Sequence, residues 1–192
     1  MKKVILGLVV ALTVVALLAA PAMAAGKSGL KGNSNVGHVY LYEKVPSGDW
    51  PIVEDGAWGK FNYKLTGEYE ATMVSGVFNG KELEVGANYT LIYYIEPADD
   101  PWEEIGTTGI YGTEVVVLGT GTVNDEGNVH IAGTAEIGEP DEQPVTGDYV
   151  DQMGDKIWLV KTDDITTIDD TTYITGWNPN EYLFESALIN TP

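Results

Sequence analysis

The feature that most constrains the fold is a series of short segments rich in Val, Ile, Thr and Tyr, separated by clusters of Gly, Asn, Asp and Pro. Such segments are typical of strands joined by turns. In residues 58–66, Phe61, Tyr63 and Leu65 alternate with polar residues, so one face of that strand should be buried and the other exposed. No segment after residue 24 carries the sustained i, i+3, i+4, i+7 apolar pattern of an amphipathic helix. The candidate strands are residues 38–44, 58–66, 69–78, 89–96, 113–123, 128–137, 156–162, 171–176 and 181–189.

The number and spacing of these segments predict the fold class. Eight or nine strands in about 150 residues favour a single antiparallel β-sandwich, immunoglobulin-like or jelly-roll-like, over a small barrel. The stretch VNDEGNV, residues 123–129, predicts a tight hairpin connection in which Gly127 takes positive φ. Residues 97–112 and 138–155 form two long acidic connections, and long loops in a compact sandwich often carry function.

The N-terminus predicts export. Lys2 and Lys3 precede an apolar run over residues 4–20, and Ala22-Met23-Ala24 follows with small residues where a signal peptidase cleaves. This pattern predicts a signal peptide at residues 1–24, a flexible leader at 25–36 and the sandwich domain at 37–192. We therefore expect a secreted or cell-surface protein with no membrane insertion after cleavage. The absence of cysteine excludes disulfides, thiolate metal sites and a lipid-modified N-terminal Cys.

Charge narrows the range of partners. The formal net charge is −19, and removal of the two signal lysines leaves 8 Lys against 29 Asp and Glu, or −21. The chain contains no arginine, which is the usual bidentate reader of phosphates. A surface of this charge repels nucleic acids and anionic membranes, so we expect neither as a partner.

Two acidic loops are candidates for a calcium site. Ca²⁺ takes six to eight oxygen ligands from carboxylates, carbonyls and water, and acidic loops at the end of a sandwich can supply them. Neither loop has the spacing of an EF-hand, and solvated turns are the alternative reading. The candidate ligands are Asp99, Asp100, Glu103 and Glu104 in the first loop and Asp163, Asp164, Asp169 and Asp170 in the second.

The aromatic residues suggest a carbohydrate platform. Trp58 and Trp158 lie inside candidate strands and should belong to the core, whereas Trp50 and Trp102 lie in loops. Aromatic rings at loop tips can pack against the apolar faces of sugars, so Trp50 and Trp102 are the candidate ligand platform. Glycosidase chemistry needs two carboxyl groups across a cleft, and no catalytic pair can be identified from spacing in a β protein.

The C-terminal stretch GWNPNEYLFESALI contains a tryptophan and two glutamates close together. Pro179 fixes φ and indicates a turn that leads into a last strand. In that strand Tyr182 and Phe184 should share one face, with Leu183 and Glu185 on the other. The alternation favours a strand over an active site.

Several segments together resemble a known family. The stretches GHVYLYEK (37–44), GAWGKFNY (56–63), VFNGKELEVGANYTLIYY (77–94), GNVHIAG (127–133), KIWLV (156–160) and GWNPNEYLFE (176–185) are similar, in order, to exported β-sandwich proteins of methanogenic archaea and some bacteria. The resemblance covers most of the chain after the signal and implies fold and location, with no established activity. The chain departs from it in residues 97–114, where a shorter connection is expected.

Two function classes remain at this stage. The first is a non-catalytic binding module for a cell-envelope glycan or another surface protein, with Ca²⁺ as its one candidate cofactor. The alternative is an extracellular glycan-active hydrolase that uses acidic-loop carboxylates. Two carboxyl groups about 5–9 Å apart in a cleft, with a shifted pKa, would favour the hydrolase. Asn88-Tyr89-Thr90 is an N-glycosylation acceptor whose use the sequence leaves open.

Overall fold

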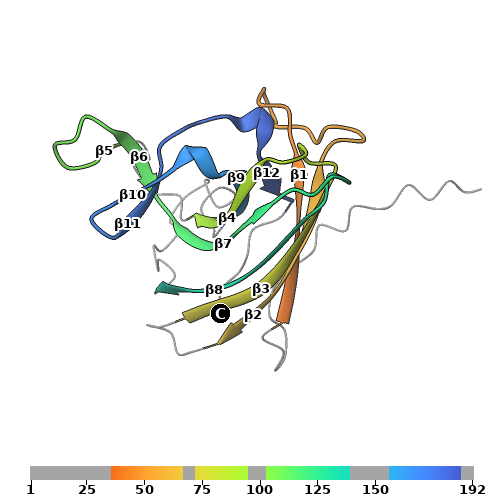
Figure 1. The fold of residues 1–192 in the computed structure, drawn as a ribbon, viewed down its shortest axis with the longest axis horizontal. Coiled ribbons are helices and arrows are strands. Elements are labelled where there is room, and N and C mark those ends of the chain that lie inside the picture. Colours follow the sequence, from red (N-terminus) through yellow and green to blue (C-terminus); the bar gives the residue numbers. More distant parts are fainter. Residues whose placement is uncertain (1–35, 67–71, 95–102, 139–155, 187–192) are drawn as a thin grey trace, which may run out of the picture.

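The computed structural model describes residues 36–66, 72–94, 103–138 and 156–186. Within these ranges the chain consists of strands, turns and single 3-10 turns, with no α-helix, and the all-β prediction is confirmed (Figure 1). The strands are β1 (Val36–Glu43), β2 (Trp58–Thr66), β3 (Thr72–Lys81), β4 (Asn88–Tyr94), β5 (Glu103–Glu104), β6 (Tyr111–Glu114), β7 (Val116–Thr122), β8 (Val129–Gly138), β9 (Lys156–Lys161), β10 (Ile165–Ile168), β11 (Thr171–Ile174) and β12 (Leu183–Glu185).

The strands form a large and a small antiparallel sheet. The large sheet has the order β7-β4-β9-β12-β1-β2-β3-β8, and the small sheet has the order β10-β11-β6-β5. The large sheet folds over on itself, so that β1, β2, β3 and β8 make one layer and β12, β9, β4 and β7 make the layer that faces it (Figure 1). The small sheet lies beyond the second layer.

The two edge strands of the large sheet, β7 and β8, approach each other closely. The predicted turn between them is confirmed, since the amide of Asn124 donates to the carbonyl of Asn128 at 2.8 Å and Gly127 has φ of 75°. However, β7 and β8 stand at opposite ends of the strand order and do not pair as a hairpin. A Cβ added to Gly133 would collide with the carbonyl oxygen of Leu118, so glycine is required where the edges meet.

Two apolar cores hold the layers together. The first lies between the layers of the large sheet and includes Leu41, Phe61, Phe78 and Leu159. The second lies between β4, β9 and β12 and the small sheet, and contains Trp158 among its buried residues. Strands β4 and β9 are therefore buried along almost their whole length, as expected for strands covered on both faces.

The layer of β1, β2, β3 and β8 has one face covered by the facing layer and one face on which no other described strand packs. In β2 the side chains of Phe61, Tyr63 and Leu65 are buried, whereas Asn62 and Lys64 are exposed, which confirms the predicted alternation. The outward side chains of these four strands form the open face of the molecule.

The C-terminal segment behaves largely as predicted. A 3-10 turn at Pro179–Glu181 leads into β12, whose described part is shorter than the predicted strand. Tyr182 and Phe184 enter the second core while Leu183 enters the first. The predicted strand 113–123 is divided between β6 and β7, which belong to different sheets. Strands β5 and β10 were not predicted, because they are too short to show a period.

Candidate functional site

The first predicted calcium loop is only partly described. Asp99 and Asp100 lie outside the described residues. Glu103 and Glu104 form β5 and are exposed, and Glu104 Oε1 accepts a hydrogen bond from the amide of Gly109 at 3.0 Å. The assignment of calcium to this loop stays a prediction.

The second predicted calcium loop does not bring its four aspartates together. Asp163 is exposed, Asp164 is buried, and Asp169 and Asp170 form the exposed turn between β10 and β11 with positive φ. Across the described ranges, no three His, Asp or Glu side chains converge in a way that could hold a metal ion. The assignment of calcium to this loop also stays a prediction.

Asp164 has a structural role that the sequence did not reveal. Its carboxylate accepts hydrogen bonds from Asn178 Nδ2 at 2.9 and 3.0 Å and from the hydroxyl of Tyr182 at 2.6 Å. Burial, followed by the bond to Asp164, raises the pKa of Tyr182 well above its ordinary value. The amides of Thr175 and Gly176 donate to the Asp164 carbonyl, so this residue ties the turn before β10 to the C-terminal segment.

Of the two predicted platform residues, only Trp50 is described. Trp102 lies outside the described residues. Trp50 is half-buried at the margin of the second core, 5.2 Å from Phe184 and 6.2 Å from Trp177 between ring centroids. The Trp50 and Trp177 rings meet at 63°, so this pair presents an edge and a face rather than a flat surface. Trp158 is buried in the second core as predicted. The same prediction for Trp58 is wrong, because its side chain is half-buried on the outward face of β2 and belongs to neither core.

Glu185, at the end of β12, is a carboxyl with a shifted pKa. Its Oε2 atom is buried, and burial raises the pKa to about 7 although Lys44 and Lys156 act in the opposite direction. The indole N–H of Trp158 lies near enough to lower this pKa slightly, but neither it nor Oε2 has a hydrogen-bond partner within the described residues. The Lys44 ammonium donates to the Glu185 backbone carbonyl at 2.8 Å. The charges that act on this carboxyl are thus lysines rather than a second acid.

The raised pKa predicts how Glu185→Gln should change the pH dependence of stability. The folded chain holds the Glu185 proton up to about pH 7, whereas the unfolded chain releases it near 4.5, so wild-type stability falls as pH rises between these values. The variant lacks this loss. It should match wild type near pH 4.5 and exceed it by about 1–3 kcal/mol at pH 8, a range reduced for partial solvation.

Urea denaturation at pH 4.5, 6, 7 and 8 measures this difference. Glu82→Gln, at an exposed position, is the matched control and should follow wild type at every pH. A difference between Glu185→Gln and wild type that does not change with pH would contradict the assigned pKa.

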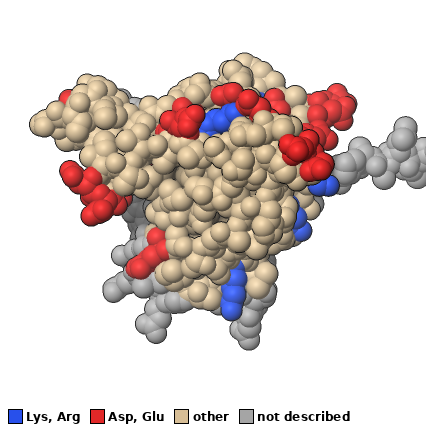
Figure 2. Space-filling model, viewed as in Figure 1, with Lys and Arg blue, Asp and Glu red and all other residues tan. Residues whose placement is uncertain are grey.

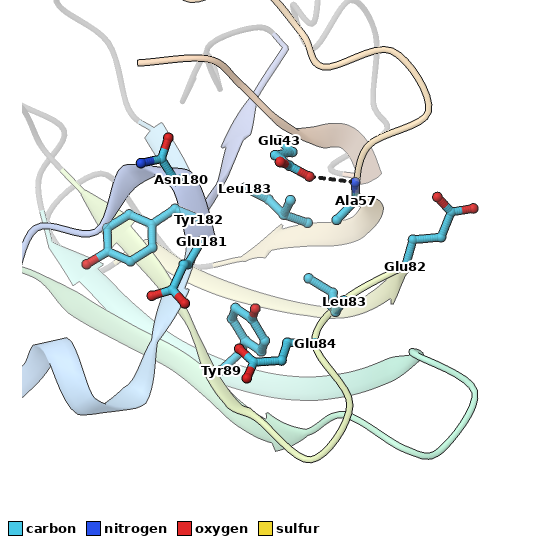
Figure 3. A pocket seen from close by; sticks show the side chains of 10 residues that line it. All are labelled: Glu43, Ala57, Glu82, Leu83, Glu84, Tyr89, Asn180, Glu181, Tyr182 and Leu183. Atoms are coloured by element: carbon cyan, nitrogen blue, oxygen red, sulfur yellow. Dashed lines mark hydrogen bonds between the residues drawn. The ribbon is translucent and has the colours of Figure 1, made fainter.

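A pocket of about 220 Å³ opens at one end of the sandwich (Figure 3). Its lining includes Glu43, Glu84, Glu181 and Tyr89, and Figure 3 shows the Glu84 and Glu181 side chains beside the Tyr89 ring. Several of these carboxylates are engaged in contacts within the fold. Glu43 Oε2 accepts a hydrogen bond from the amide of Ala57 at 3.0 Å. The ammonium of Lys161 pairs with Glu84 and lies 3.7 Å from Glu181.

The open face carries an ordered set of aromatic side chains. Tyr40 and Tyr42 are two positions apart on β1, and their rings lie nearly parallel, 23° apart with centroids 6.3 Å apart. His38 packs edge-on against Tyr40 at 5.7 Å. Trp58 on β2 is directly opposite Tyr42. These rings therefore form a strip along β1 that continues onto β2.

Polar and basic residues of the open face stand beside this strip. The strand registers place Lys60 opposite Tyr40, Asn79 opposite Lys60 and His130 opposite Asn79, which makes one row across four strands. Lys60 Nζ lies 5.5 Å from the Tyr40 ring centroid. His130 Nδ1 and Asn79 Oδ1 are 2.8 Å apart.

Charge is segregated on this molecule. The outward positions described in β1, β2 and β3 contain no Asp or Glu, and the acid of the open face is Glu136 on β8. Figure 2 shows acidic side chains at the top, the left and the upper right of the molecule, and lysines both among the acids at the top and along the lower right margin. Three of the lysines on the open face, Lys60, Lys64 and Lys81, have no acidic partner within the described ranges.

Sequence reasoning missed the open face and favoured the loops instead. One signal was available: Lys60 and Lys64 alternate with the buried Phe61, Tyr63 and Leu65, which places both lysines on one outward face. The juxtaposition of β1 with β2 and β3 was not accessible, because it depends on the order of strands in the sheet.

Comparisons with known proteins complete the description of the chain. No helix in the described part of the chain is long and apolar enough to cross a membrane. The comparisons found no match to a protein family model, to a curated protein or to a solved structure.

Proposed function

We propose that this chain is an exported, non-catalytic β-sandwich protein that binds a cell-envelope glycan through its open face. The observation that carries the proposal is the strip of Tyr40, Tyr42 and Trp58 on a sheet face that the small sheet leaves uncovered. Rings held side by side on a rigid strand can pack against the apolar faces of consecutive sugars. Export rests on the N-terminal signal pattern, and the resemblance to exported β-sandwich proteins points the same way.

The open face suits this role better than the loop tryptophans. The Tyr40 and Tyr42 rings lie nearly parallel, whereas Trp50 and Trp177 meet edge to face. Trp50 also contacts Phe184 of the second core, so its ring is partly committed to the fold. Asn62 is exposed beside the strip and can exchange hydrogen bonds with sugar hydroxyls.

The proposal predicts that Tyr40→Ala with Tyr42→Ala abolishes most glycan binding. Aromatic stacking on a ring contributes about 1–3 kcal/mol for planar ligands, so loss of both rings should weaken binding at least tenfold. Affinity electrophoresis of the purified protein in gels that contain neutral or charged polysaccharides measures the change in affinity.

Tyr111→Ala is the matched control for this experiment. Tyr111 is 56% exposed on β6 in the small sheet, and its removal should leave binding unchanged. Melting temperatures within a few degrees of wild type would show that each variant is folded. Equal losses from Tyr111→Ala and from the double variant, or no binding to any glycan, would contradict the proposed function.

The acidic pocket is the feature that favours the alternative function, a glycan-active hydrolase. Four glutamates line it, which are Glu43, Glu82, Glu84 and Glu181. Lys161 forms ion pairs with two of them, and the carboxyl with a raised pKa, Glu185, is not among the lining residues. Release of reducing ends from a bound polysaccharide, abolished by Glu43→Gln or Glu181→Gln, would favour the hydrolase over the binding module.

A further inference from the structure

The lysines of the open face specify the ligand further. Lys60, Lys64 and Lys81 stand in a chain with almost three times as many acids as lysines, yet none of them forms an ion pair with a described residue. By contrast, Lys161 beside the acidic pocket is paired with two glutamates. In a protein this acidic, three unpaired lysines on one face without acidic neighbours in β1 to β3 create a local positive field.

Two of these lysines are held in place by the aromatic strip. Lys60 Nζ lies over the Tyr40 ring and Lys81 Nζ lies over the Trp58 ring, at 5.5 and 5.6 Å from the centroids. Cation–π contact orients an ammonium group while leaving its other side open to a carboxylate. Each of these two pairs therefore places a lysine charge directly beside an aromatic ring.

The spacing of the lysines favours an extended ligand over a compact anion. Lys81 is opposite Trp58, which makes it a diagonal neighbour of Lys60, about 7–8 Å away at the backbone. Lys64 is four residues along β2 from Lys60, or about 13 Å. With Lys64 about 13 Å along the strand from Lys60, the three charges match a series of anionic groups along a polymer better than one phosphate group.

We infer that the open face binds an extended polysaccharide that bears carboxylate groups. The rings of Tyr40 and Tyr42 contact its sugar rings, and Lys60, Lys64 and Lys81 contact its carboxylates. This inference rests on the proposed glycan-binding function and adds the charge class of the ligand. Nucleic acid fits less well, because the face has no arginine to read phosphates in a bidentate manner.

The net charge of the chain does not prevent this binding. Exposed charges farther apart than about 8 Å are largely screened at physiological ionic strength. The outward positions described in β1, β2 and β3 carry lysines and no acid, so a polymer on the open face meets the lysines at closest range.

The test compares purified wild-type protein with Lys60→Gln/Lys64→Gln/Lys81→Gln on four polymers. These are polygalacturonate, dextran, poly-glutamate and single-stranded DNA. We expect wild type to prefer polygalacturonate, with affinity falling on the order of tenfold between 50 and 200 mM NaCl for three released counterions. The triple variant should bind polygalacturonate roughly tenfold to hundredfold more weakly.

A control variant separates local from overall charge. Val85→Glu/Ile110→Glu/Tyr111→Glu changes the net charge by the same three units at exposed positions away from the open face. It should retain polygalacturonate binding, and an equal loss in both triple variants would overturn the inference.

The remaining outcomes distinguish the two levels of the proposal. Salt-independent binding to dextran that is lost in Tyr40→Ala/Tyr42→Ala would support glycan binding and overturn the carboxylate inference. Stronger binding to poly-glutamate or DNA than to polygalacturonate would also overturn it. Binding to no glycan, neutral or charged, would contradict the proposed function itself.

Discussion

Replacing Gly133 by alanine is expected to lower the melting temperature by roughly 6–12 °C. The added Cβ would collide with the carbonyl oxygen of Leu118 and lie 2.6 Å from its carbonyl carbon. Both partners are backbone atoms, so no side-chain rotation relieves the clash and the edge strands β7 and β8 must separate. We expect a cost of about 3 kcal/mol or more, and each kcal/mol shifts the melting temperature by about 2–4 °C in a chain of this size.

Gly109→Ala is the matched control for this variant. Gly109 has φ of 72° and open space around the position of a Cβ, so alanine there costs about 1 kcal/mol from backbone strain alone. Differential scanning calorimetry of both variants separates the steric cost from the conformational one. Similar melting temperatures for Gly133→Ala and Gly109→Ala would contradict the close approach of the two edges.

Replacing Asp164 by alanine is expected to reduce the free energy of unfolding by about 3–4 kcal/mol. The change removes a buried carboxylate that accepts hydrogen bonds from Asn178 and Tyr182. A hydrogen bond to a charged group contributes about 1.5–3 kcal/mol, and the fully buried Tyr182 hydroxyl would keep only the Gly176 carbonyl, at 3.2 Å. Urea denaturation at pH 7 measures the loss.

The neighbouring residue and a double-mutant cycle control this prediction. Asp163→Ala, at an exposed position in the same 3-10 turn, should change stability by less than about 0.5 kcal/mol. Tyr182→Phe should cost about 1.5–3 kcal/mol, and the double variant should cost less than the sum of the single variants by about 1 kcal/mol or more. Strict additivity would show that the two side chains do not act together.

This result bears on how the calcium prediction should be tested. Substitution of Asp164 would destabilise the fold with or without calcium, because its carboxylate accepts hydrogen bonds from the side chains of Asn178 and Tyr182. Variants of Asp99 and Asp100 in the first loop avoid this complication. A calcium-specific rise in melting temperature that those variants remove remains the expectation for that loop.

Local patterns in the sequence were sufficient for the features that depend on neighbouring residues. The alternation of Phe61, Tyr63 and Leu65 determined which face of β2 is buried, because side chains alternate along any strand. Gly127 determined a turn because positive φ costs glycine little. Tyr182 and Phe184 were correctly predicted to share one face, because residues two positions apart in a strand point to the same side.

The candidate site depended on information that a linear pattern does not carry. Trp50 looked like a loop residue open to solvent, but packing against Phe184 makes it part of the second core. Asp164 looked like one of several acids, and its burial follows from contact with residues 14 and 18 positions away. The composition of the sequence gives the total number of acidic residues, but it does not show that they are absent from the outward positions described in β1, β2 and β3.

The sequence by itself determined an all-β chain, the strand faces and the turns, because backbone preference and side-chain period act over a few residues. Only the tertiary structure decided which strands are neighbours, and therefore that Tyr40, Lys60 and Lys81 share one open face. Strand order and register are set by the burial of both cores together, which no single segment specifies. The proposed binding surface is a product of that long-range pairing.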